Sequence, residues 1–313
     1  MNTRFCRALV LAALIAPAIA TAAQKTFVMV PKGVHPYYEP CYEGFKAAAQ
    51  KYGVKVEKVD PQKFELPLQV RVIEDLIAQH VDGIAISALD DAGLVPVIHD
   101  AMKAGIKVIT FDAPAPSSEA LEYIGTDNEA AGFAAGKKMG EVMGGKGNIV
   151  ILQGGLGATN LNLRTKGFKA ALAKSAPGVK VLEVVNENGD FNEATNKTEA
   201  VLQTYPDLTA IFSVSAEGAP AAAQVLKQQG KAGKILVAGF DDLKDTLEGI
   251  KDGSVSFCLV QKTFKMGWLS IEALLDATKG KKLPKVTDTG VLFVTKANVG
   301  TYMDEMIKEF AAK

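Results

Sequence analysis

The sequence predicts an α/β protein built from two doubly wound parallel-sheet lobes. Two observations support this: short β-branched runs alternate with longer amphipathic segments, and the alternation occurs in two separate blocks. Strands that are apolar on both faces and separated by helices are typical of parallel sheets covered by helices on each side. Because the pattern breaks at 123–128 ("YIGTDN") and restarts at Asn148, we expect two lobes of similar construction, with the break as a crossing point between them.

The first block is predicted to contain four strands and three helices. Its strands span 27–30, 54–59, 83–87 and 107–111, and its helices span 39–52, 68–79 and 94–103. The second block repeats the arrangement with one helix more. Its strands span 148–152, 179–185, 210–214 and 235–239, and its helices span 161–175, 192–205, 219–229 and 243–251.

The N-terminus reads as a secretory signal peptide over residues 1–23. Two arginines precede a short apolar run from 8 to 19, and small residues follow, so that cleavage after Ala22 or Ala23 fits equally well. The run is short for a membrane span, although an uncleaved anchor is the alternative. Cys6 precedes the apolar run, where it cannot be the lipidated residue of a lipoprotein. We therefore expect an exported, periplasmic protein.

Charge and cysteine content narrow the function classes. Cleavage removes Arg4 and Arg7 from 35 basic and 35 acidic residues, which leaves a net charge of −2. Without a cluster of lysine and arginine, nucleic-acid binding is not expected. The mature chain keeps Cys41 and Cys258, and the sequence leaves open whether they form a disulfide or are two small buried side chains.

The predicted topology places a ligand at the carboxyl ends of the strands, where open α/β sheets bind their ligands. Six loops follow the strands there: PKGVHPYY, SALDD, DAPAP, QGGLGATN, VSAEG and FDD. Tyr37 and Tyr38 would give this cleft flat apolar walls. The expected polar groups are Asp112, Asn160, Arg164, Asp241 and Gln261. Flat aromatics with hydrogen-bonding groups suit a small polyhydroxylated molecule.

Each of these residues also has a plainer interpretation. Tyr37 and Tyr38 could cap the first helix, and Asp112 and Asp241 could be helix caps or turn formers. Charged side chains such as Arg164 and Lys32 usually remain in water.

The chain resembles the ribose- and galactose-type periplasmic sugar-binding proteins, the substrate receptors of bacterial ABC importers. The similarity runs from about residue 27 to the end. It rests on "DGIAISALD", "AGIKVITFDAP", "YIGTDN", "RTKGF", "VAGFDD" and "LVQKTFKMGW" in this order. It implies a type I periplasmic binding protein with a three-segment hinge, an N-terminal lobe of 24–126 plus 262–289 and a C-terminal lobe of 127–261 plus 290–313. It also implies a monomer that closes around one sugar and delivers it to a membrane permease.

The resemblance assigns ligand contacts residue by residue. They fall on Tyr37, Tyr38, Asp112, Arg164, Asp241 and Gln261. The chain departs from the ribose type where Ala113 and Pro114 follow the strand-end aspartate, and where Ser215 and Ala216 replace an Asn-Asp pair. Two polar contacts are thus missing, which puts ribose itself in doubt.

The autoinducer-2 receptor of the same superfamily offers an alternative. Lys32 in "VPK", Ala216 and "APAAAQ" at 219–224 resemble it, but its Asp-Gln pair would fall on Asn160 and Leu161, and its tryptophan on Arg164. We therefore expect a monosaccharide or a related polyol, with Lys32, Asn160 and Ala216 as further candidates for contact.

Enzymatic motifs are incomplete. Gly155-x-Gly157 lacks the third glycine of a dinucleotide site, because Asn160 stands there, and no Walker sequence is present. His35, His80 and His99 lack metal-ligand spacing and are interpreted as surface or packing residues. We expect no enzyme, no catalytic residue, no cofactor and no metal. A transcriptional repressor would need an N-terminal helix-turn-helix, but a signal peptide is expected there instead. An exported enzyme on the same scaffold stays an open alternative.

Overall fold

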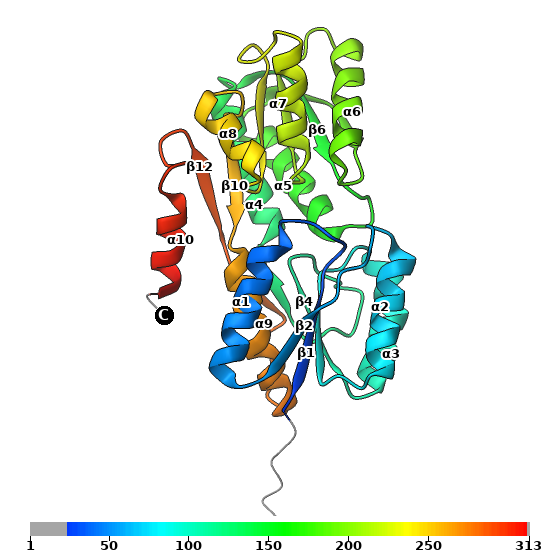
Figure 1. Ribbon diagram of the computed structural model, residues 1–313. Helices are drawn as coiled ribbons and strands as arrows, with labels where there is room; N and C mark the ends of the chain where they lie inside the picture. Colours follow the sequence, from blue (N-terminus) through cyan, green and yellow to red (C-terminus); the bar gives the residue numbers. More distant parts are fainter. Residues whose placement is uncertain (1–23, 312–313) are drawn as a thin grey trace, which may run out of the picture.

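The computed structural model describes residues 24–311, and of residues 307–311 only the backbone; the predicted signal peptide lies outside this range. The chain forms two lobes, each built on a six-stranded sheet with helices packed on it (Figure 1). We name the lower one in that view, which contains β1, the N-terminal lobe and the upper one the C-terminal lobe. The predicted architecture is confirmed.

The sheet of the N-terminal lobe is entirely parallel, in the order β11-β5-β4-β3-β1-β2. Its strands are β1 (Thr26–Val30), β2 (Lys55–Lys58), β3 (Gly83–Ile86), β4 (Lys107–Phe111), β5 (Tyr123–Gly125) and β11 (Val286–Asp288). The helices that follow or cover them are α1 (Tyr38–Tyr52), α2 (Leu66–Ala78), α3 (Asp91–Lys103) and α9 (Thr263–Thr278).

The sheet of the C-terminal lobe has the order β12-β10-β9-β8-β6-β7, and only β12 runs antiparallel to its neighbour. Its strands are β6 (Lys146–Gln153), β7 (Gly178–Asn186), β8 (Ala210–Ser213), β9 (Leu236–Phe240), β10 (Phe257–Gln261) and β12 (Val291–Thr295). Its helices are α4 (Asn128–Val142), α5 (Thr159–Ser175), α6 (Phe191–Thr204), α7 (Gly218–Gln228) and α8 (Lys244–Asp252), and α10 (Tyr302–Ala311) follows β12.

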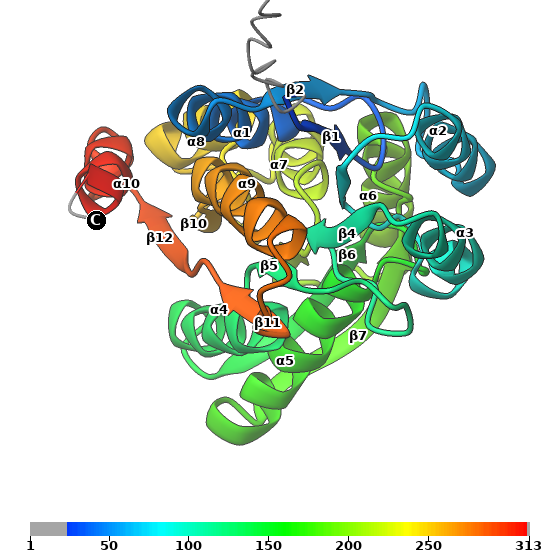
Figure 2. The same cartoon turned by 90° about the horizontal axis from the view of Figure 1, so that it is seen from below.

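Alternating side chains of each strand enter different cores. Phe27 and Met29 of β1 pack on the side of α1 and α9, whereas Val28 and Val30 pack on the side of α2 and α3. The view from below shows these helix pairs on opposite faces of the sheet (Figure 2). This double burial explains why the strands read as continuous apolar runs and not as alternating ones.

Every predicted strand and helix is present within a few residues of its expected bounds. The sequence predicts no element at β5, β11 or α4, nor in the segments from β10 onward. The segment "YIGTDN" at 123–128, which was expected as a crossing point, begins with a strand of the N-terminal sheet, β5. Only its last residues leave the N-terminal lobe.

The chain passes between the lobes three times: after β5, after β10, and between β11 and β12. Side chains tie these segments together. The Asp288 carboxylate accepts hydrogen bonds from the backbone N–H groups of Asp127 (2.9 Å) and Gly290 (2.8 Å). The Thr126 hydroxyl donates to Gln261 Oε1 at 2.8 Å, which links the first crossing to the second.

Cys41 and Cys258 are both buried and both free, which answers the question that the sequence left open. They lie in different cores, one in each lobe. Within residues 24–311, no helix combines the length and the apolar character that crossing a membrane requires.

Glycines bring one helix pair in each lobe into close contact. In the N-terminal lobe, a Cβ on Gly267 of α9 would lie 1.8 Å from the Cys41 carbonyl oxygen of α1. In the C-terminal lobe, a Cβ on Gly132 of α4 would lie 2.1 Å from the carbonyl oxygen of Arg164 on α5. Both neighbours are backbone atoms, so the helices can approach this closely only because these positions lack a side chain.

We expect Gly132→Ala to destabilise the protein although alanine is the better helix former. Relieving the contact with α5 requires the helices to move apart, and such overpacking costs about 1–3 kcal/mol. The melting temperature should therefore fall by several degrees in a thermal unfolding experiment. Gly300→Ala is the matched control, because no atom lies within 4 Å of its Cβ position. Equal melting temperatures for the two variants would contradict this packing argument.

Candidate functional site

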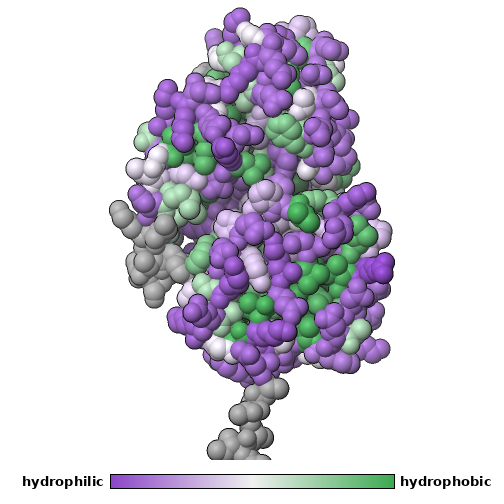
Figure 3. Space-filling model, in the orientation of Figure 1, coloured by the Kyte–Doolittle hydropathy of each residue, from purple (hydrophilic) through white to green (hydrophobic). Residues whose placement is uncertain are grey.

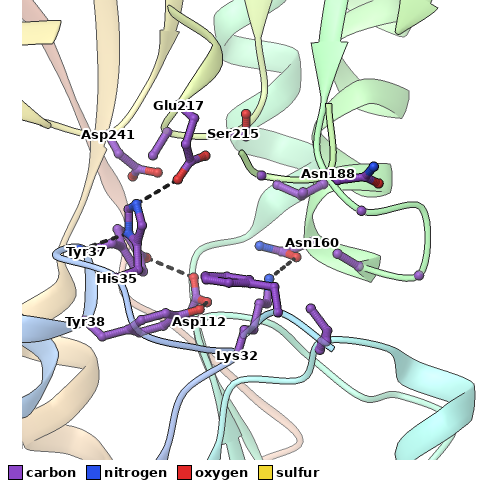
Figure 4. A pocket seen from close by; sticks show the side chains of 18 of the residues that line it. Lys32, His35, Tyr37, Tyr38, Asp112, Asn160, Asn188, Ser215, Glu217 and Asp241 are labelled. Atoms are coloured by element: carbon purple, nitrogen blue, oxygen red, sulfur yellow. Dashed lines mark hydrogen bonds and ion pairs between the residues drawn. The ribbon is translucent and has the colours of Figure 1, made fainter. Parts of the chain in front are cut away.

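A cavity of about 320 Å³ lies between the lobes, at the carboxyl ends of the strands. Loops from both lobes line it, as Figure 4 shows. All nine ligand contacts expected from the sequence lie along it: Lys32, Tyr37, Tyr38, Asp112, Asn160, Arg164, Ala216, Asp241 and Gln261. The topology has therefore gathered residues that are up to 229 positions apart in the sequence into one site.

Asp112 and Asp241 occupy equivalent places in the two lobes. Each directly follows a buried strand, β4 or β9, and each has a left-handed backbone, with φ of 58° and 68°. The N–H of Asp112 donates to Ile124 O (3.1 Å) and that of Asp241 to Leu259 O (2.7 Å), so both are held by the next strand. Aspartate tolerates this conformation better than most residues. Neither caps a helix; the N-cap of α8 is Leu243.

Three hydroxyl groups hold the Asp112 carboxylate. Tyr37 donates to Oδ1 at 2.9 Å, while Tyr38 (3.3 Å) and Ser87 (2.6 Å) donate to Oδ2. The two tyrosine rings meet edge to face, 5.2 Å apart. Burial raises the pKa of both phenols well above the ordinary value, so they remain hydrogen-bond donors. The tyrosines therefore form a rigid aromatic wall with a carboxylate at its edge.

Arg164 is the largest fully buried side chain, with 1% of its surface exposed. Its Nε donates to Asn128 Oδ1 at 2.8 Å, and its Nη1 donates to Val214 O at 3.0 Å. The guanidinium carbon lies 4.1 Å from the centre of the Phe240 ring. Nη2 is buried and has no partner among the residues that the structure describes. A cavity-lining guanidinium thus has one donor group unused.

Asp241 connects the cavity to the hinge. Gln261 Nε2 donates to Asp241 Oδ1 at 3.0 Å, and the same amide accepts from Thr126 of the first crossing. Burial raises the pKa of Asp241 to about 7, against the opposing effects of the Arg164 charge and the Gln261 hydrogen bond. The Gln261 side chain therefore links this carboxylate to the first crossing, and Gln261 itself stands at the start of the second.

Polar contacts between residues 24–306 join the two lobes at the cavity. Lys32 Nζ donates to Asn160 Oδ1 at 3.1 Å, and His35 Nε2 lies 2.7 Å from Glu217 Oε1 (Figure 4). The N–H of Asp91 also faces the carbonyl oxygen of Gly157, at 3.4 Å. Burial lowers the pKa of Lys32, and the nearby Asp112 charge opposes that shift. The structure therefore has the lobes closed on the cavity.

The sequence alone does not single out His35 or Glu217 as site residues. His35 reads there as a surface or packing histidine, whereas it lines the cavity and pairs with Glu217. That expectation was wrong for His35, because the pairing depends on a residue from the other lobe. The "VSAEG" loop had been placed at the cleft, so Glu217 could have been found from the list of strand-end loops.

Glu187 acts behind the cavity wall. Its fully buried carboxylate accepts hydrogen bonds from the Ser215 hydroxyl and from the N–H groups of Gly189 (2.8 Å) and Asp190 (3.2 Å). Burial raises its pKa to about 7, opposed by the Ser215 hydrogen bond. Ser215 and Gly189 line the cavity, so Glu187 holds two loops of its wall in place. No sequence motif marked this residue.

The donors and acceptors of this site suit hydrogen bonding more than metal coordination. Within the described part of the chain, no three His, Cys, Asp or Glu side chains are grouped so that they could hold a metal ion. What the cavity offers is an aromatic wall, a free guanidinium donor and carboxylates from both lobes. These groups can bind a small molecule rich in hydroxyl groups.

Known proteins share both the sequence and the fold. Residues 26–282 match the family described as "Periplasmic binding protein domain". The ribose import binding protein RbsB of Bacillus subtilis is 31% identical over 253 residues, which cover 80% of each chain. The D-ribose/D-allose-binding protein of Pseudomonas aeruginosa is 26% identical, over 85% of this chain and 82% of its own.

Two solved structures extend the comparison. An ABC transporter solute binding protein from Burkholderia graminis, in complex with D-arabinose, is 42% identical with a TM-score of 0.86, over 90% of this chain and 99% of that one. The glucose-galactose binding protein GanP from Geobacillus stearothermophilus is 31% identical with a TM-score of 0.86, over 89% and 100%. This chain therefore belongs to the periplasmic binding protein family. Its two mostly parallel sheets, three crossings and interlobe cavity give it the fold of the type I sugar-binding members.

Proposed function

We propose that this protein is the substrate-binding protein of an ABC importer, which binds a monosaccharide or polyol between its lobes and delivers it to a membrane permease. The observation that carries this proposal is the unused Nη2 group of Arg164, buried at the cavity. A buried donor without a partner costs free energy. A ligand hydroxyl that accepts a hydrogen bond from Nη2 would offset that cost, so the site favours a ligand with an acceptor at this position.

The remaining groups favour a neutral polyhydroxylated ligand. The Tyr37–Tyr38 wall suits the apolar face of a sugar ring, and the carboxylates of Asp112 and Asp241 would accept from hydroxyl groups on either side. The cavity cations Lys32 and Arg164 are outnumbered by the acids Asp90, Asp112, Glu217 and Asp241, so an anionic ligand would lack a counter-charge. Relatives named for ribose, allose and xylitol, and a neighbour that holds D-arabinose, agree with this class.

A second candidate ligand is an autoinducer-2-type signal molecule. Lys32 favours it, because this cation points into the cavity and bonds to Asn160 of the other lobe. An exported enzyme is the less favoured alternative, and we propose that the protein is not an enzyme and needs no cofactor.

One binding experiment separates these candidates. Ligand-stripped protein is titrated with D-arabinose, D-ribose, D-allose, xylitol and autoinducer-2 by isothermal titration calorimetry, and the recovered ligand is checked chemically. Saturable binding of one unchanged sugar or polyol supports the proposal. Binding of autoinducer-2 alone favours the signal receptor, and turnover of any ligand overturns the binding-protein function.

The hinge would divide the chain into 24–126 plus 262–289 and 127–261 plus 290–313. We propose that the open protein binds its ligand on one lobe and that the second lobe then rotates over it, as in other hinge closures. Closure expels water and thereby strengthens the hydrogen bonds to the ligand. The permease would recognise the closed form through both lobes.

We also propose that the protein is a periplasmic monomer. Its large exposed apolar side chains lie on different elements, among them Tyr52 on α1, Val142 on α4 and Val286 on β11. The face in Figure 3 is mostly hydrophilic, with apolar areas mainly over the N-terminal lobe. The export signal that this localisation requires lies outside the described residues.

Arg164→Lys should weaken binding of the best ligand by well over tenfold. Lysine keeps the charge but loses the planar fork that holds Nη2 toward the ligand. Removing one partner of a buried charged hydrogen bond costs about 2–5 kcal/mol, and each 1.4 kcal/mol is tenfold in Kd. Lys166→Ala is the control, since it changes an exposed cation two residues away on the same helix. A folded Arg164→Lys protein with unchanged Kd would move the ligand away from Arg164.

Asp241→Asn should abolish tight binding yet stabilise the ligand-free protein, more so at high pH. Burial raises the pKa of Asp241 to about 7, so folding favours the protonated carboxyl. The resulting contribution to the free energy of unfolding is fully present below the ordinary pKa of aspartate, and it is lost as the pH rises through about 7. The melting temperature of the variant relative to the native protein should therefore be higher at pH 8 than at pH 5. Asp304→Asn, at an exposed carboxylate, should show no such difference. A pH-independent difference for Asp241→Asn would contradict the assigned titration.

A further inference from the structure

His35 and Glu217 meet across the cavity from opposite lobes. His35 lies in the loop between β1 and α1, and Glu217 lies just before α7. Their side chains are 17% and 12% exposed, so the pair is largely shielded from water. Opening the hinge separates the two residues, because His35 belongs to the N-terminal lobe and Glu217 to the C-terminal lobe.

The His35 ring is oriented by its own lobe. The Tyr37 N–H donates to Nδ1 at 3.1 Å, and the ring meets Phe64 edge-on at 6.3 Å. With Nδ1 occupied as an acceptor, Nε2 is the nitrogen that carries a hydrogen toward Glu217. The imidazole is thus positioned to receive the carboxylate when the lobes close.

The charges around His35 are mainly negative. Glu217, Asp241 and Asp112 face it from the loops after β8, β9 and β4, while Lys32 lies in its own loop. The other charged side chains of the cavity are Arg164 on α5 and Asp90 before α3. Burial lowers the pKa of His35, but the Glu217 hydrogen bond and the three acidic charges outweigh it, and the net shift is upward.

Closing the lobes and protonating His35 therefore favour each other. Protonation disturbs the bond from the Tyr37 amide, which opposes the effect, but it gives Glu217 a charged partner in a shielded place. Glu217 and Asp241 belong to the other lobe, so their upward effect on the pKa of His35 belongs to the closed form, and of the three acids only Asp112 stays beside His35 when the lobes are apart.

We propose that His35 and Glu217 form a clasp between the lobes that takes up a proton on closing, so that ligand affinity rises as the pH falls. The proposal rests on the proposed function, since it concerns closure around the ligand of the same cavity. It makes His35 and Glu217 affinity-determining residues in addition to the groups expected to contact the ligand.

The sign follows from proton linkage. A group with a higher pKa in the closed form favours closure fully below its open-form pKa, which for histidine is ordinarily near 6.5. That contribution is lost as the pH rises through the closed-form pKa. Binding should thus weaken from about pH 6.5 upward and should be accompanied by proton uptake.

Calorimetry tests the clasp with D-arabinose as the first probe, then the other sugars and polyols of the panel. Titrations at pH 6–8.5, in phosphate and in Tris, give the Kd and the number of protons taken up. Glu217→Gln and His35→Gln should each remove about half or more of the pH dependence of Kd and of the proton uptake. His99→Gln is the matched control, because His99 pairs with Glu119 at the surface of a single lobe and should leave both unchanged.

Comparison with the variants separates the clasp from Asp241 and Glu187, whose pKa values of about 7 place them in the same pH range. If the native protein and both clasp variants share one pH profile, the proposal is overturned even though sugar binding stands. Binding with no proton uptake in the native protein also overturns it.

A measurement without ligand keeps the clasp testable if no probe binds, in which case the proposed function fails separately. Spin labels are attached to the variant Gln62→Cys, Leu156→Cys, because both positions are exposed loop residues of different lobes. The native Cys41 and Cys258 are buried, which protects them from labelling. Double electron–electron resonance measures the distance between the two labels. The short distance of the closed form should be more populated at pH 6 than at pH 8.5, and Glu217→Gln should lose this shift. A distance distribution independent of pH would overturn the clasp.

Discussion

The fold depends on one constraint: the carboxyl ends of parallel strands meet at a single edge of their sheet. Here two such edges face each other, and the loops that leave them have no apolar core to enter. Asp112 and Asp241 illustrate the result, because each leaves its strand in a left-handed conformation that the next strand secures. The cavity exists because two copies of one topology are joined face to face.

The hinge and the cavity share side chains, and this connects binding to closure. Gln261 bonds to Asp241 in the cavity and to Thr126 in the first crossing, while Asp288 bonds to both the first and the third crossings. A ligand bound at Asp241, as we propose, would therefore act on the segments that cross between the lobes. Direct contacts between the lobes, such as that of Lys32 with Asn160, then add to the stability of the closed form.

The site contains buried polar groups that cost the folded protein stability. The unused Nη2 of Arg164 and the raised pKa values of Asp241 and Glu187 all lower the stability of the empty protein at neutral pH. The glycine contacts of α4 with α5 work in the opposite sense, because they fix the helix that carries Arg164. Rigid packing behind the site holds its binding groups in place, as a selective binding site requires.

The sequence by itself determined the α/β class, the two lobes, the order of most elements and the strand-end loops that line the cavity. It could do so because doubly buried strands leave a continuous apolar signature, and because parallel topology puts their ends together. It did not reveal β5, β11 or α4, which are short or weakly amphipathic, nor the elements from β10 onward, nor the free state of Cys41 and Cys258. Only the tertiary structure decided that His35 faces Glu217 and that Glu187 supports the cavity wall, since each contact joins segments whose proximity no local pattern encodes.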